Sequence, residues 1–218
     1  MNMRDDWAQL DDVLIDAQRA AQGFLKSVAQ RPVGHVLPAL EPDILPDEGL
    51  GARGALAAFR GKYEAWLAAS SGPRYLGFVT GGTTPAALAG DWLVAAYDQN
   101  VGSAGDSIAT TVEHETLGLL RSLFGLPETF EGAFVTGATM ANFVALATAR
   151  QWAAQRLGID VSEQGLWRMP PVPVLGGSPH ASVLKALAML GMGRQVMEQL
   201  PHVPESMAVD QRGLCCKE

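Results

Sequence analysis

The 218-residue sequence has only two cysteines, Cys215 and Cys216, which are adjacent and close to the end of the chain. Two neighbouring cysteines cannot build a disulfide framework, and the other ligands of a zinc site are missing. The N-terminus is polar and acidic, without the apolar segment of a signal peptide. No apolar run is long enough to span a membrane. We therefore expect a cytoplasmic protein with no membrane partner.

Aromatic residues are also scarce, at 7%, and positive charge is outweighed, because the net charge is −7. An acidic chain is a poor candidate for nucleic-acid binding, so we expect no nucleic-acid partner. Hydrophobic residues make up 48% of the chain and there are 24 glycines. This composition is sufficient for a core of closely packed helices on a sheet. The length allows one large domain or two small ones.

The most informative stretch runs from Gly132 to Arg150. Residues 133–136 form a short apolar run that predicts a buried strand, and a helical pattern begins at Thr139 or Met140. The tiny residues Gly137 and Ala138 lie between them. A helix that begins there has unpaired N–H groups and a positive dipole end, which together favour a phosphate, and Thr139 adds a hydroxyl. The alternative is a tight turn in an α/β core, and neither a P-loop nor a Rossmann motif is present.

A second segment repeats this pattern. Residues 172–175 predict another buried strand, a glycine-rich turn leads to His180, and a helix is expected over 181–190. His180 would therefore lie at the edge of the sheet where open α/β folds bind ligands. A histidine at such a turn is more often a helix cap or a surface residue, and this alternative remains open.

The N-terminal region predicts a helix with one apolar stripe that repeats as heptads. The stripe packs either on its own domain or on a second subunit. Acidic residues in the early turns suit the start of a helix. The stripe contains Trp7, Leu10, Leu14, Ala17, Ala21, Phe24 and Val28, and the acidic residues are Asp5, Asp6, Asp11, Asp12 and Asp16.

The middle of the chain predicts a proline-rich connector over 31–50, then helices over about 51–69 and 85–97. Thr110 and Glu113 fit a capping box for a further helix that reaches Phe124. We do not expect Glu113, His114 and Glu115 to bind a metal. Neighbouring helical residues point in different directions, and no second histidine lies four positions away.

Three blocks of the sequence together resemble the group II pyridoxal-phosphate-dependent decarboxylases, which include the aromatic amino acid and glutamate decarboxylases. The blocks are 78–91 (FVTGGTTPAALAGD), 134–142 (FVTGATMAN) and 180–186 (HASVLKA). The resemblance is collinear from about residue 30 to residue 210. It implies an α/β fold, that of the fold-type I pyridoxal phosphate large domain, with a mostly parallel sheet flanked by helices. The large domain would be incomplete over 75–218, and residues 1–74 would form an N-terminal helical dimerisation segment.

The resemblance also implies roles for individual residues. Gly137, Ala138 and Thr139 would hold the phosphate of pyridoxal 5'-phosphate, and His180 would stack on its ring. The substrate pocket for an amino acid would be lined by Phe78, Val79, Thr80 and Gly81, near the interface of a homodimer. Met140 stands where relatives often carry an acidic residue. The implied function is an amino acid decarboxylase, a carboxy-lyase.

Two expected groups are not found in the sequence. Such enzymes need a Schiff-base lysine and an aspartate beside the pyridine nitrogen, and in the family both lie further along the chain. The available lysines are Lys26, Lys62, Lys185 and Lys217. Lys185 matches a family position that is not the Schiff-base lysine, so we identify no catalytic residue. We expect the N-terminal part of a longer decarboxylase, inactive alone.

Two other functions fit the same sequence. One is a different fold-type I reaction, such as that of an aminotransferase or a desulfurase, although the histidine block favours decarboxylation. The other is a cofactor-binding or dimerising module without catalytic activity. Fold type alone does not determine the reaction.

Overall fold

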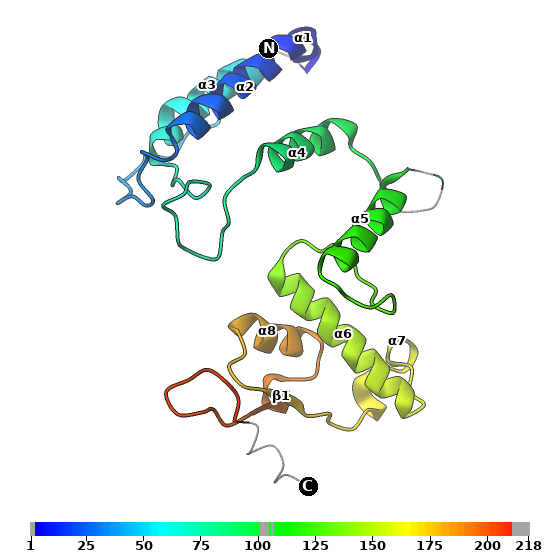
Figure 1. Cartoon of the computed structure of the whole chain (residues 1–218). Helices are drawn as coiled ribbons and strands as arrows, with labels where there is room; N and C mark the ends of the chain where they lie inside the picture. Colours follow the sequence, from blue (N-terminus) through cyan, green and yellow to red (C-terminus); the bar gives the residue numbers. More distant parts are fainter. Residues whose placement is uncertain (1–2, 101–104, 106, 211–218) are drawn as a thin grey trace. The chain divides into compact units, whose positions relative to one another are not determined.

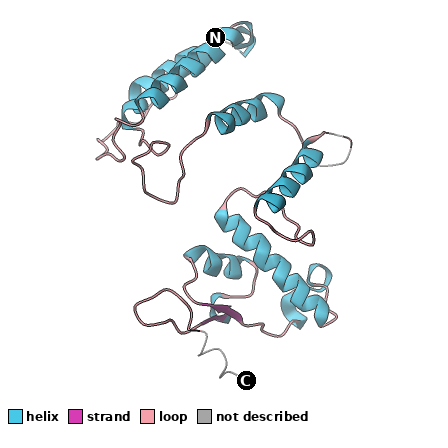
Figure 2. Cartoon of the chain, in the orientation of Figure 1, coloured by secondary structure: helices cyan, strands magenta, loops and turns pink. Residues whose placement is uncertain are grey.

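The computed structural model describes residues 3–100, 105 and 107–210. The chain divides into two compact units, Met1–Gln99 and Asn100–Glu218 (Figure 1). Helices predominate in both units, whereas the paired strands lie in the second (Figure 2). None of the helices in the described ranges is both long enough and apolar enough to cross a bilayer. The predicted domain division at residues 74 and 75 remains a prediction.

The first unit is helical apart from its connecting loops. Its elements are α1 (Met3–Ala8), α2 (Leu10–Ser27), α3 (Gly51–Tyr63), the 3-10 turn η1 (Glu64–Trp66) and α4 (Pro85–Tyr97). The proline-rich segment between α2 and α3 contains no helix or strand, as predicted. The helix expected over 51–69 ends earlier, because the backbone tightens into η1 and becomes extended at Leu67.

Acidic residues of α1 and α2 contact the start of α3. Asp6 Oδ1 accepts a hydrogen bond of 2.9 Å from the backbone N–H of Ala52, and so supplies a cap that α3 lacks in its own sequence. Arg53 pairs with Asp16 at 2.7 Å and with Asp12 at 3.3 Å. The acidic side chains that the sequence assigned to their own helix therefore also fix the neighbouring helix.

The predicted helix over 85–97 is confirmed as α4. Thr84 Oγ1 accepts a hydrogen bond of 3.2 Å from the N–H of Ala87, and Pro85 occupies the first helical position. Asp98 ends the helix in the left-handed conformation, with a φ of 44°. The boundaries of α4 follow from local sequence signals.

The second unit alternates helices with short irregular or extended segments. Its elements are α5 (Ala109–Leu123), α6 (Ala138–Arg156), α7 (Val161–Gln164), η2 (Leu166–Arg168), β1 (Val174–Gly176), α8 (Ala181–Met189), η3 (Arg194–Val196) and β2 (Met197–Gln199). The strands β1 and β2 pair in parallel, with Val174 opposite Met197. The α/β class is confirmed, with a small parallel sheet in the described residues.

Two local predictions for this unit are wrong. Residues 133–136 are not a strand, because the N–H of Phe134 donates to the Glu113 carboxylate, at 3.0 Å, rather than to a neighbouring strand. The capping box is also wrong: α5 begins at Ala109, and its N-cap residue makes no side-chain hydrogen bond. Glu113 therefore accepts a hydrogen bond from the segment that precedes α6, and does not cap its own helix.

The buried centre of the second unit lies between α6 and α8, which pack against each other. Ala154 of α6 and Ala186 and Leu187 of α8 are fully buried. Small alanine side chains let the two helices approach closely, and Leu187 fills the remaining space. The unit therefore depends on a small number of apolar contacts.

Replacing Leu187 by alanine should destabilise this unit strongly. Removal of a fully buried leucine leaves a cavity and typically lowers the free energy of unfolding by about 2–5 kcal/mol. The measurement is hydrogen exchange of α6 and α8 in the whole chain. Met189→Ala on the same helix is the control, because Met189 is 60% exposed and its loss should cost about 0.5 kcal/mol or less. Equal effects of the two substitutions would contradict this account of the core.

Candidate cofactor site

The start of α6 has the properties of an anion-binding turn. Gly137 is the N-cap residue, with φ 150° and ψ 175°, and no side chain caps this helix. The first helical hydrogen bond runs from the N–H of Ala141 to the Gly137 carbonyl, at 3.0 Å. The N–H groups of Ala138, Thr139 and Met140 therefore precede the helical ladder and have no carbonyl partner within it. Together with the helix dipole they favour a phosphate at this point.

His180 lies at the start of α8 and is its N-cap residue. Its ring nitrogen Nδ1 accepts a hydrogen bond from the backbone N–H of Ser182, at 3.2 Å, and lies 2.9 Å from Ser182 Oγ. The histidine is thus a helix cap, which was the alternative left open by the sequence, and its ring is held in one orientation. The rest of the ring remains exposed.

Two contacts show that α6 and α8 run in the same direction and in register. Asn142 Nδ2, in the second turn of α6, donates to Ser182 Oγ, in the first turn of α8, at 2.8 Å. Eight residues further along both helices, Arg150 Nη1 donates to the Leu190 carbonyl at 3.1 Å. Parallel helices in register have their N-terminal ends at the same side. The turn at 137–139 and His180 are therefore brought to one side of the second unit.

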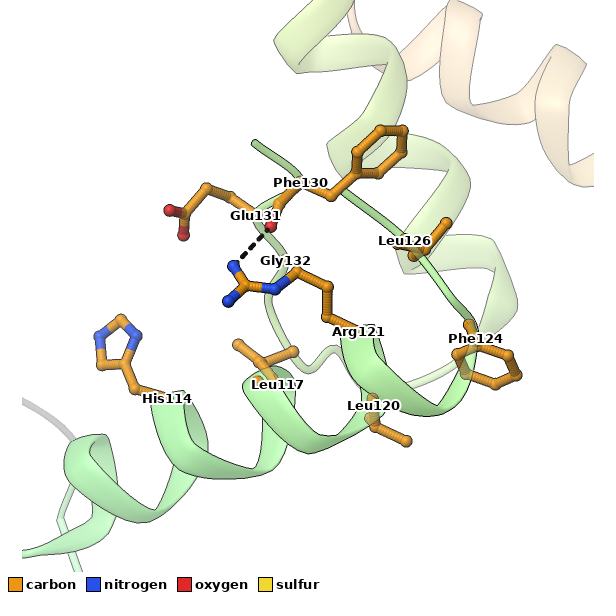
Figure 3. A pocket seen from close by; sticks show the side chains of 10 residues that line it. His114, Leu117, Leu120, Arg121, Phe124, Leu126, Phe130, Glu131 and Gly132 are labelled. Atoms are coloured by element: carbon orange, nitrogen blue, oxygen red, sulfur yellow. Dashed lines mark hydrogen bonds between the residues drawn. The ribbon is translucent and has the colours of Figure 1, made fainter. Parts of the chain in front are cut away.

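The segment that leads into α6 is held by α5. Arg121 Nη1 donates to the carbonyls of Glu128, at 3.1 Å, and Phe130, at 3.4 Å, and Glu113 accepts from the N–H of Phe134. Figure 3 shows Arg121 reaching from α5 to the loop across a cleft of about 290 Å³, with His114 further along the helix. We assign this cleft a structural role, because the guanidinium of Arg121 is engaged in holding the backbone carbonyls of Glu128 and Phe130.

The predicted substrate-pocket residues lie in the first unit. Phe78 and Val79 have φ values of 52° and 59°, and their side chains are almost fully exposed. A left-handed backbone is strained for a β-branched residue such as Val79, and strain of this kind is often found at functional sites. Thr80 is held by hydrogen bonds of its N–H and hydroxyl to the Gly77 carbonyl. The assignment of 78–81 to a pocket remains a prediction.

Sequence reasoning missed three residues that shape this region: Glu113, Asn142 and Ser182. Asn142 and Ser182 fall inside the blocks that carry the family resemblance, but they are 40 residues apart, and no local pattern pairs them. In the described part of the chain, no group of three His, Cys, Asp or Glu side chains could hold a metal ion.

Gly137→Ala should distort the turn at 137–139. Gly137 occupies a region of backbone conformation that is essentially confined to glycine, and a side chain there costs of the order of 1–3 kcal/mol. No atom lies within 4 Å of a Cβ built at Gly137, so the cost is conformational and not steric. Urea unfolding followed by circular dichroism measures it. Gly118→Ala within α5 is the control and should be neutral or stabilising, because that glycine is helical. Stabilisation by Gly137→Ala would contradict the observed turn.

The chain is similar in sequence to known amino acid decarboxylases. No protein-family model matches the chain. The L-2,4-diaminobutyrate decarboxylase of Rhizobium meliloti (strain 1021) is 27% identical over 195 residues, which are 89% of this chain and 37% of that protein. The aromatic-L-amino-acid decarboxylase of Bacillus atrophaeus is 32% identical over 123 residues, 55% of this chain and 23% of that protein.

A solved structure has the same fold. The crystal structure of Oryza sativa TDC with PLP and tryptamine matches with a TM-score of 0.80 at 21% identity, over 95% of this chain and 47% of that chain. The chain therefore spans less than half the length of each of these relatives. The resemblance found in the sequence is confirmed: the chain is a partial match to the group II pyridoxal-phosphate-dependent decarboxylases and has their α/β fold.

Proposed function

We propose that this chain supplies the phosphate-binding and ring-stacking part of a pyridoxal-phosphate-dependent amino acid decarboxylase, a carboxy-lyase. The observation that carries the proposal is the in-register parallel packing of α6 and α8, which brings Gly137–Thr139 and His180 to one side of the second unit. The similarity to decarboxylases supports this reaction over that of an aminotransferase or a desulfurase.

The residues present fit pyridoxal phosphate. The N-terminus of α6 has no capping side chain, and the space that a Cβ would enter at Gly137 contains no atom within 4 Å. A phosphate can therefore approach the N–H groups of Ala138 and Thr139 closely. At the same side, the exposed ring of His180 is fixed by its hydrogen bonds to Ser182. One group offers an anion site and the other a flat surface for an aromatic ring.

Each part of the chain then has a separate task. When bound, pyridoxal phosphate supplies a ring that accepts the electrons released as the substrate carboxylate leaves as carbon dioxide. Gly137, Ala138 and Thr139 bind the phosphate, and His180 orients the ring. Phe78, Val79, Thr80 and Gly81 line the pocket for the amino acid side chain. The chain's own contribution is thus binding and orientation.

We further propose that the 218-residue chain is inactive alone, because none of its lysines is identified as the Schiff-base lysine that the reaction needs. Lys62 donates to Asp43 at 2.6 Å, and this hydrogen bond raises the pKa of Lys62 above its ordinary value, which keeps the amine protonated. Lys26 lies in the last turn of α2. Lys185 is exposed on α8, more than one turn beyond His180. Lys217 lies outside the described residues.

A homodimer is the second part of the proposal. The N-terminal part of the apolar stripe of α1 and α2 remains uncovered although α2 packs on α3, since Trp7 is 69% and Leu14 is 54% exposed. Exposed apolar surface of this kind is typical of an interface between subunits. We propose that the helices of a second copy cover it, and that the protein acts in the cytoplasm.

The first test compares pyridoxal phosphate with pyridoxal, which lacks the phosphate, by absorbance titration of the whole chain. We expect tighter binding of pyridoxal phosphate, and Thr139→Val should weaken it by about 10- to 100-fold, the usual effect of losing a hydrogen bond to a charged group. Pyridoxal binding should be unaffected by Thr139→Val. The control is Thr148→Val on the same helix, because the Thr148 hydroxyl donates only to the Val144 carbonyl, at 3.0 Å.

Borohydride reduction followed by mass spectrometry completes this test. We expect no stoichiometric adduct at any lysine. Equal affinities for pyridoxal phosphate and pyridoxal would overturn the proposed phosphate site. A single stoichiometric adduct, at Lys185 for example, would instead overturn the statement that the chain is inactive alone.

The dimer has its own test. Leu14→Lys places a charge on the exposed apolar stripe and should shift the sedimentation of the chain from dimer to monomer. Gln18→Lys adds the same charge at an exposed position of α2 outside the heptad series and should leave the dimer intact. A monomeric unmodified chain, or equal effects of both substitutions, would exclude this interface.

A further inference from the structure

A chain of hydrogen bonds connects α6 to the ring of His180. Asn142 Nδ2 donates to Ser182 Oγ at 2.8 Å, and Ser182 Oγ lies 2.9 Å from His180 Nδ1. The backbone N–H of Ser182 points at the same ring nitrogen, at 3.2 Å. Ser182 is 8% exposed, the only buried polar side chain in the described ranges.

The direction of these hydrogen bonds follows from the chemistry of the groups. A backbone N–H can only donate, so Nδ1 must accept and carries no proton in the neutral ring. Ser182 Oγ already accepts from the Asn142 amide, which leaves its own O–H to donate to the same nitrogen. All three contacts therefore require the same tautomer, with the ring proton on Nε2.

We propose that Asn142 and Ser182 are positioning residues that hold His180 in the Nε2–H tautomer and fix its ring for the cofactor. This proposal rests on the proposed function, in which His180 faces pyridoxal phosphate. Because Nδ1 is engaged with α8, the only remaining polar group of the ring is the Nε2–H. A bound ligand therefore meets a hydrogen-bond donor on His180 and never a lone pair.

The same hydrogen bonds couple the two halves of the site. Asn142 lies three residues beyond Thr139 on α6, about 4.5 Å along the helix axis. The amide of Asn142 thus ties the helix that would bind the phosphate to the residue that orients the stacking ring. An N-cap alone explains the bond from the Ser182 N–H to Nδ1, but it gives no role to Asn142 or to a buried hydroxyl directed at the ring.

The experiment is nitrogen NMR of the imidazole rings in the whole chain labelled with ¹⁵N-histidine, without any cofactor. His180→Gln assigns the signal among the four histidines. In the unmodified chain we expect Nδ1 to be unprotonated and hydrogen-bonded, and Nε2 to carry the proton. Asn142→Asp replaces the donor by a carboxylate that accepts the Ser182 O–H, so Ser182 Oγ turns its lone pairs towards His180. His180 Nδ1 then loses the hydrogen bond from the hydroxyl and keeps only that from the backbone N–H, so its signal should shift.

The matched control is Ser178→Ala. Ser178 lies in the same turn, but its hydroxyl is 3.4 Å from His202 Nε2 and does not contact His180. This substitution should leave the His180 signals unchanged. A proton on Nδ1 in the unmodified chain, or identical His180 signals in Asn142→Asp, would overturn the proposal. Because Asn142 is only half-buried, this variant tests the idea even if Ser182→Ala does not fold.

Binding measurements separate this proposal from the proposed function. Ser182→Ala should weaken pyridoxal phosphate and pyridoxal alike, by about 3- to 10-fold, since the ring contact is common to both. Thr139→Val should affect only the phosphorylated form. The predicted tautomer in a chain that binds neither compound would support the hydrogen-bond chain and overturn the cofactor function. Phosphate-dependent binding together with unchanged His180 signals in Asn142→Asp would support the cofactor function and overturn the hydrogen-bond chain.

Discussion

The candidate site depends on the parallel, in-register packing of α6 against α8. Two polar contacts, Asn142 with Ser182 and Arg150 with the Leu190 carbonyl, fix the register at both ends of the interface. The second contact also places a cation at the C-terminus of α8, where helix carbonyls are unsatisfied and the dipole is negative. Between them the buried alanines allow close approach. A shift of one helix along the other would separate the turn at 137–139 from His180.

This interface is one of the few parts of the chain that bury apolar side chains. Within the described residues only six hydrophobic side chains are buried: Ala69, Ala154, Val161, Ala186, Leu187 and Leu190. The exposed apolar side chains include Trp7 and Leu14 of the apolar stripe of α1 and α2. Further protein surface is needed to cover these groups, which agrees with a proposed dimer.

How much could be predicted from the sequence depends on how local each signal is. The helices α4, α6 and α8 begin or end within about two residues of the predicted positions, because periodicity, Thr84 and the glycine turns act within a few residues. The run at 133–136 has the composition of a strand, but a strand also needs a neighbour, and Glu113 takes the N–H of Phe134. The hydrogen bond between Asn142 and Ser182 could not be predicted from local sequence either, since it joins residues of two different helices.

The proposed cofactor site can be recognised although no catalytic residue is identified. In the proposed function, binding and orienting the cofactor is the task of different residues from those that perform the reaction. Both proposed cofactor contacts come from turns that immediately precede helices, so their geometry is set by the helix ends and by one helix–helix interface. The Schiff-base lysine that the proposed reaction needs is not identified among the lysines of this chain. Orientation of the ring is separable from the chemistry that the ring performs. Under the proposed function, a chain that keeps α6, α8 and the hydrogen bonds between them would therefore recognise the phosphate and the ring without turnover.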